Sequence, residues 1–213
     1  MNFLLSLIRE KERLGPLIDQ MVRPAVCSRS TWTPLDGYIE SNVSIISDEE
    51  FSSIFPSKSL SFSGYPSCIP LSEQNKQLSG RWKAQPFGSQ RPPDFIGFEA
   101  VRDQLYIFYV ECKSSKTNKA TWNCSLPIPL LHVIYPFFNT TSKQLSICTG
   151  ADLITSVDYE ALKAVMPLIR EKNTIGHLSS DWNLYLRPMW CTSRVHPDNT
   201  VLLCQYLEGL VKM

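Results

Sequence analysis

Cysteine pairs of the kind that bind zinc are absent from this chain, although it contains seven cysteines. No two cysteines are spaced as Cys-x-x-Cys and their number is odd, so the sequence signals neither a zinc site nor a disulfide framework. Reduced thiols are the ordinary state of cysteines in a reducing compartment. We therefore expect a cytoplasmic location.

Long apolar runs and internal repeats are missing as well. Segment 1–8 is apolar, but it is too short for a membrane span, lacks a basic start and continues directly into the charged residues 9–13. We expect neither a signal peptide nor an association with membranes.

The chain does have the composition of a compact globular domain. Its 213 residues are 43% hydrophobic and 19% charged, which is enough for one substantial core. We expect a single domain over residues 1–213, of the α/β class, with a central mixed sheet of about five strands flanked by helices. Apolar periodicity predicts strands at 95–98, 105–112, 130–138, 145–148 and 181–190, and helices at 1–22, 47–55, 155–170 and 201–211. Apart from helix 47–55, residues 27–80 are expected to form loops and short strands.

The most informative motif is Pro93-Asp94 followed by Glu111-Cys112-Lys113. The residues that lead into Glu111 are aromatic and β-branched, which is typical of a buried strand. Because a polar turn at 102–104 separates this strand from the preceding extended stretch, Asp94 and Glu111 are expected on neighbouring strands. Side chains alternate along a strand, so Glu111 and Lys113 should project from one face and Cys112 from the other.

Two carboxylates and a lysine in this arrangement suit a magnesium-dependent phosphodiesterase. Mg²⁺ prefers oxygen ligands, often one or two carboxylates with waters and phosphate oxygens, so Asp94 and Glu111 are the candidate metal ligands. Lys113 lies on the same face and can hold or deprotonate the attacking water, while the metal polarises the phosphate. The alternative is an ordinary amphipathic strand, on which Glu111 and Lys113 form a solvated pair worth only ~0.2–1 kcal/mol.

The motif resembles that of the PD-(D/E)xK nuclease superfamily, and more narrowly of type II restriction endonucleases, at Pro93, Asp94, Glu111 and Lys113. The resemblance implies a restriction-endonuclease-like fold and Mg²⁺-dependent hydrolysis of both strands of a short, specific double-stranded DNA site. Because most such sites are palindromic, it also implies a homodimer. A companion DNA methyltransferase would complete a restriction-modification system.

The same resemblance suggests that a helix near the N-terminus lends an acidic side chain to the metal site. Glu10 and Glu12 are the candidates in the expected helix 1–22. Simple exposure to solvent is the alternative for both.

Candidate DNA-binding residues lie in two places. The chain has 21 Lys and Arg against 20 Asp and Glu, so a DNA surface requires a local concentration of cations. Lys116 and Lys119 follow the candidate catalytic strand and can neutralise phosphates. Asn183, Tyr185 and Arg187 share one face of the expected strand 181–190, where Asn and Arg can read base edges. A solvated loop and a polar strand surface are the alternatives.

Three other functions remain open. A repair or recombination nuclease of the same superfamily would share the site but read DNA structure instead of sequence. A DNA-binding protein without catalytic activity would bind DNA without cutting it in the presence of Mg²⁺. A structural or interaction protein would show neither DNA binding nor a dependence on metal.

Overall fold

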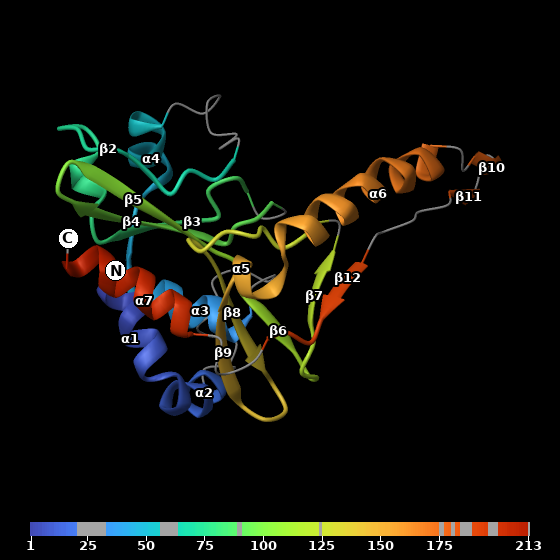
Figure 1. The fold of residues 1–213 in the computed structure, drawn as a ribbon, viewed down its shortest axis with the longest axis horizontal. Coiled ribbons are helices and arrows are strands. Elements are labelled where there is room, and N and C mark those ends of the chain that lie inside the picture. Colours follow the sequence, from blue (N-terminus) through green and yellow to red (C-terminus); the bar gives the residue numbers. More distant parts are fainter. Residues whose placement is uncertain are drawn as a thin grey trace.

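The structure, a computed structural model, describes residues 1–20, 33–55, 64–88, 91–123, 125–174, 177–179, 182–183, 189–195 and 200–212. It is an α/β structure in which a mixed central sheet is flanked by helices, as the sequence predicts (Figure 1). In these ranges no helix combines the length and the hydrophobicity that a membrane span requires.

Within the described residues the central sheet has eight strands, more than the sequence indicated. They are β1 (Ser44–Ile45), β2 (Cys68–Pro70), β3 (Arg81–Ala84), β4 (Phe95–Val101), β5 (Gln104–Val110), β6 (Lys113–Ser115), β8 (Val133–Asn139) and β9 (Gln144–Thr149). Neighbours in the order β1-β3-β4-β5-β8 are hydrogen-bonded, with β2 also on β5, and β6 and β9 also on β8. The prediction of about five strands was too low because β1, β2, β3 and β6 have only two to four residues, too few to show a clear alternating pattern.

The β4–β5 hairpin forms as the sequence predicts, with antiparallel pairing along both strands. β5 and β6 then run parallel to β8 along the same edge and in the same register. Glu111 and Cys112 lie between β5 and β6, and the amide of Glu111 continues the ladder by donating to the carbonyl of Ile134 at 3.0 Å. The motif residues therefore lie at the short interruption between β5 and β6, next to the residue that precedes β4.

Helices cover the two faces of the sheet differently. α1 (Asn2–Arg9), α2 (Lys11–Gln20), α3 (Pro34–Asn42) and α7 (Val201–Lys212) contribute to the core cluster that contains Phe95 and Phe108. α4 (Asp48–Ile54) and α5 (Gly150–Leu153) contribute to a second cluster, which contains Ile96 and Tyr109. Figure 1 shows α1, α2 and α7 together on one side of the sheet and α4 on the other. Side chains on the two faces of β4 and β5 thus pack into two different cores.

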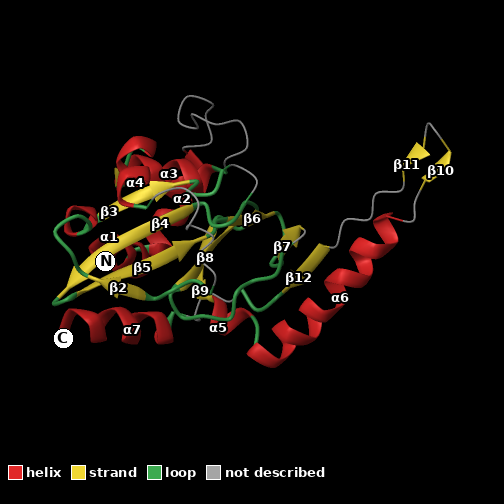
Figure 2. Ribbon diagram, turned by 90° about the horizontal axis from the view of Figure 1, so that it is seen from above, coloured by secondary structure: helices red, strands yellow, loops and turns green. Residues whose placement is uncertain are grey.

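A long helix and two small sheets extend from the central sheet. α6 (Ser156–Thr174) leads away from it, and β10 (His177–Ser179) pairs with β11 (Trp182–Asn183) beyond the end of α6 (Figure 2). β12 (Met189–Thr192) instead pairs with β7 (Ala120–Asn123). The prediction of one strand over 181–190 was wrong in this respect, because β11 and β12 belong to different sheets.

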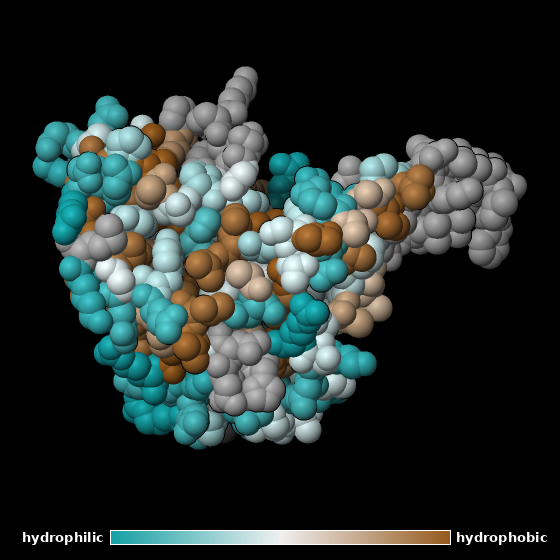
Figure 3. Space-filling model, in the orientation of Figure 1, coloured by the Kyte–Doolittle hydropathy of each residue, from teal (hydrophilic) through white to brown (hydrophobic). Residues whose placement is uncertain are grey.

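Apolar side chains lie on the surface of α6 (Figure 3). Val157 is 79% exposed and Leu168 is 60% exposed. These positions contribute little to the cores, so small substitutions at them are expected to leave the fold intact.

A close approach of two backbones fixes α2 against the turn between β8 and β9. A Cβ atom added at Gly15 would lie 2.0 Å from the carbonyl oxygen of Lys143, which is part of the backbone and cannot move aside cheaply. We expect Gly15→Ala to lower the free energy of unfolding by about 1–3 kcal/mol, measured by urea denaturation. Gly209→Ala in α7 is the control, since nothing lies within 4 Å of its added Cβ. It should stabilise the protein by up to ~1 kcal/mol, and equal effects of the two changes would contradict this interpretation.

Candidate functional site

Asp94 is held at the break between β5 and β6. It directly precedes β4 and follows the buried Pro93, whose peptide bond with Pro92 is cis. The Asp94 Oδ2 atom accepts a hydrogen bond from the amide of Cys112 at 2.7 Å. The hairpin register and this bond together place the Asp94 carboxylate beside the Glu111-Cys112-Lys113 segment.

Glu111 and Lys113 form an ion pair on one face of the sheet, as the sequence predicts. The Lys113 Nζ atom lies 2.5 Å from Glu111 Oε1, and the two side chains are only 18% and 13% exposed. The Glu111 Oε2 atom is buried and has no hydrogen-bond partner within the described part of the chain. Cys112 points to the opposite face and joins the core. The pair is therefore largely desolvated, unlike the solvated surface pair that was the alternative.

A third carboxylate, Asp36, approaches Asp94 from α3. Asp36 is 4% exposed, and its Oδ2 atom accepts from the amide and the hydroxyl of Thr33 at 2.8 and 2.7 Å, in a capping box. Its Oδ1 atom is buried, with no hydrogen-bond partner among the described residues. Asp36, Asp94 and Cys112 can together hold a metal ion, because one ligand atom of each lies within 4.8 Å of the other two.

The electrostatics of this cluster favour a bound cation. Burial raises the pKa of Asp94 to about 8, and the carboxylates of Glu111 and Asp36 add to the rise. The amide of Cys112 and the ammonium group of Lys113 oppose it without cancelling it. Carboxylates that have lost water and lie close together need either a proton or a cation.

The thiol of Cys112 is a poor competitor for such a cation at neutral pH. Its pKa is raised by burial and further by Asp36 and Asp94, so the thiol keeps its proton. Metal ligands must be deprotonated. The carboxylate oxygens are therefore the ligands that this cluster offers, and they suit a hard divalent ion.

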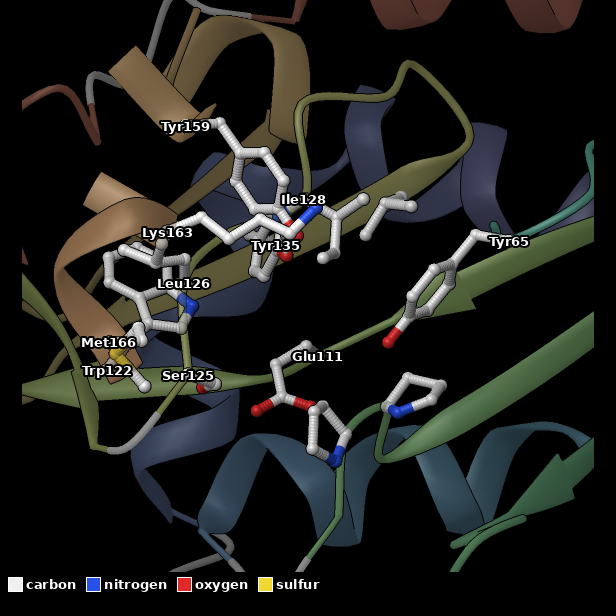
Figure 4. A pocket seen from close by; sticks show the side chains of 13 residues that line it. Tyr65, Glu111, Trp122, Ser125, Leu126, Ile128, Tyr135, Tyr159, Lys163 and Met166 are labelled. Atoms are coloured by element: carbon white, nitrogen blue, oxygen red, sulfur yellow. Dashed lines mark hydrogen bonds between the residues drawn. The ribbon is translucent and has the colours of Figure 1, made fainter. Parts of the chain in front are cut away.

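A pocket of about 230 Å³ opens beside Glu111. It is lined by side chains from β7, from the loop 125–128 and from α6, among them Trp122, Tyr159 and Lys163. Figure 4 shows the Glu111 carboxylate pointing into the pocket and the Tyr65 hydroxyl facing it from the other side. The candidate catalytic residues therefore adjoin a hollow lined mainly by aromatic and other apolar side chains.

The structure places the candidate DNA-binding residues apart from one another. Lys116 and Lys119 are exposed in the loop between β6 and β7, close in sequence to the ion pair. Asn183 belongs to β11, beyond the end of α6 and away from the carboxylates (Figure 2). Tyr185 and Arg187 lie outside the described residues.

The acidic residue that lies close to Asp94 is Asp36 of α3, and the expected helix 1–22 places neither Glu10 nor Glu12 there. Glu10 pairs with Arg13 at the surface, and Glu12 is exposed. The sequence did carry a local signal for α3, because Thr33-Pro34-Leu35-Asp36 has the form of a capping box with Pro at the first helical position. That signal fell within residues 27–80, most of which were expected to form loops and short strands.

No family model matches the chain, and neither a curated protein nor a solved structure does. The interpretation of the site therefore depends on its geometry and on the motif.

Proposed function

We propose that this chain is a type II restriction endonuclease that hydrolyses both strands of a short, specific double-stranded DNA site with Mg²⁺. The observation that carries the proposal is a set of largely buried acidic residues at the motif: Asp36 and Asp94 lie close together, and the Glu111–Lys113 ion pair is near enough for the Glu111 charge to raise the pKa of Asp94. Two of their buried carboxylate oxygens, Asp36 Oδ1 and Glu111 Oε2, have no hydrogen-bond partner among the described residues. A mixed sheet with helices on both faces is compatible with the restriction-endonuclease-like fold that the motif suggests.

Asp94 and Glu111 are the proposed Mg²⁺ ligands, with Asp36 as a third carboxylate close to the metal. When bound, Mg²⁺ would polarise the phosphate and the attacking water. Lys113 would hold or deprotonate that water through its Nζ atom, which already lies on the same face as Glu111. Lys116 and Lys119 would neutralise phosphates of the DNA that flank the site.

The proposed oligomeric state, partner enzyme and location follow from the proposed activity. A palindromic site is matched by a two-fold symmetric protein, so the enzyme would act as a homodimer. A companion methyltransferase would modify the same DNA site as the other half of a restriction-modification system. Such a pair would act in the cytoplasm.

Digestion of unmethylated phage DNA tests the activity directly. Purified protein should give discrete fragments with Mg²⁺ and no cleavage with EDTA, because the carboxylate cluster supplies no electrophile of its own. A smear of products would indicate a nuclease without sequence specificity or one that reads DNA structure. Intact DNA under both conditions would contradict the proposed function.

Asp36→Asn tests the carboxylate that the sequence did not reveal. We expect cleavage to fall by about 10- to 100-fold and the Mg²⁺ concentration for half-maximal rate to rise, because one negative charge near the metal is lost. Asn retains an acceptor oxygen for Thr33, so the thermal midpoint should change little. Glu10→Gln removes the same charge from an exposed position and should cleave like the original protein. Equal rates for both variants would exclude Asp36 from the site.

A further inference from the structure

The pocket beside Glu111 has the size of a single ring system. Its volume is about 230 Å³, below the roughly 300–1,000 Å³ of sites that enclose drug-sized molecules. It has aromatic walls, with Tyr65 at one side and Trp122 and Tyr159 at the other (Figure 4). A flat aromatic group fits such walls by stacking.

Contacts with neighbouring rings fix two of these rings. The ring of Tyr65 meets that of Tyr109 edge-on, with centroids 4.8 Å apart. Trp122 meets Tyr135 in the same way, with centroids 5.6 Å apart. Rings that are already oriented lose little conformational entropy when a ligand stacks on them.

Among the described residues, one buried hydrogen-bond donor that lines the pocket has no acceptor. The Trp122 side chain is 2% exposed, and its Nε1 atom has no partner in the described ranges. Figure 4 shows this nitrogen on the side of the indole that faces Glu111 across the pocket. A buried N–H group without a partner is costly, so a ligand that presents a ring nitrogen or a carbonyl oxygen would be favoured there.

The position of the pocket next to the carboxylates decides what kind of flat group can reach it. Pro93 and Glu111 line the pocket and are the chain neighbours of Asp94 and Cys112, so the pocket lies next to the group formed by Asp36, Asp94 and Cys112. The Nζ atom of Lys113, the ion-pair partner of Glu111, lies 5.8 Å from the centroid of the Trp122 ring. A phosphate held at the cluster would therefore bring its own nucleoside to the mouth of the pocket. A base that stays stacked in the duplex cannot enter it.

We propose that the pocket receives one unstacked base of the DNA substrate, from a nucleotide next to the phosphate that is cut. This proposal rests on the proposed nuclease function and adds to it a step in which a base leaves the helix. Stacking on Tyr159, together with a hydrogen bond from Trp122 Nε1, would offset the cost of unpairing.

Binding in EDTA separates this step from cleavage. Short fluorescein-labelled duplexes, built around the cut site, carry either a mismatched base or an abasic residue at each position in turn. Both changes weaken pairing, but only the mismatch supplies a base. At one position next to the cut, the mismatched duplex should bind about 10-fold more tightly than the abasic duplex, measured by fluorescence anisotropy.

Pocket variants assign that preference to the proposed residues. Tyr159→Ala and Trp122→Phe should each reduce it to less than about 3-fold, since they remove a stacking face and the indole donor. Val157→Ala, at an exposed position of α6 outside the pocket lining, should keep it. Equal affinity for mismatched and abasic duplexes at every position, or a preference that survives both pocket variants, would overturn the proposal and leave the nuclease function standing. Failure to bind or cut any DNA would overturn both.

Discussion

Asp94→Asn is expected to reduce DNA cleavage by at least about 1,000-fold, because it removes a proposed ligand of the metal that would polarise the phosphate. Asn has nearly the shape of Asp and keeps an acceptor for the amide of Cys112, which Asp94 Oδ2 now binds at 2.7 Å. The β4–β5 hairpin should therefore stay in place. Initial rates of plasmid cleavage over a range of Mg²⁺ concentrations measure the loss.

Asp103→Asn is the matched control for this variant. Asp103 lies exposed at the turn between β4 and β5, so it loses the same charge on the same hairpin but far from the cluster. Its cleavage rate should equal that of the original protein. An Asp94→Asn protein that is folded, binds DNA and still cuts within about 10-fold of the original rate would remove Asp94 from the mechanism.

The metal-free protein is expected to lose stability as the pH rises. The pKa of Asp94 goes from 3.8 in its reference state to about 8 in the folded protein, mainly through burial and the carboxylates of Glu111 and Asp36. Between these values the folded protein retains a proton that the unfolded chain has released, so the free energy of unfolding falls with rising pH and levels off above about pH 8. We expect a loss of about 2–4 kcal/mol between pH 5 and pH 8, measured by urea denaturation in EDTA.

Two further measurements connect this loss to the cluster. Asp94→Asn cannot titrate at this position, so most of the pH dependence should disappear and the metal-free variant should be the more stable protein at pH 8. Saturating Mg²⁺ should also restore stability at pH 8, by ~2.7 kcal/mol at 100 times the dissociation constant. A pH profile that is the same with and without Asp94 would show that another group carries the dependence.

The expected opposite effects of Asp94→Asn on stability and on cleavage have one physical origin. Carboxylates crowded in a desolvated site repel one another when no cation is bound. The same crowding would make the site selective for a divalent ion. The residue whose replacement should stabilise the metal-free protein is therefore the one whose loss should abolish cleavage.

Much of the central sheet was predictable from local sequence. β4, β5, β8 and β9 lie where apolar and β-branched residues recur, since side-chain alternation along a strand depends only on the chain itself. Strands of two to four residues carry little of this pattern, and β1, β2, β3 and β6 form because neighbouring strands offer them hydrogen-bond partners. Their formation depends on tertiary structure.

The sequence by itself determined which face Glu111, Cys112 and Lys113 occupy and that Asp94 lies beside them at the start of the neighbouring strand. Both follow from strand periodicity and a short hairpin, which are local. Only the tertiary structure decided that Asp36 joins Asp94, that Glu111 loses its water, and that α6 and β7 form a pocket with Glu111 in its wall. Burial and electrostatic coupling arise from contacts between elements far apart along the chain, and no local pattern specifies them.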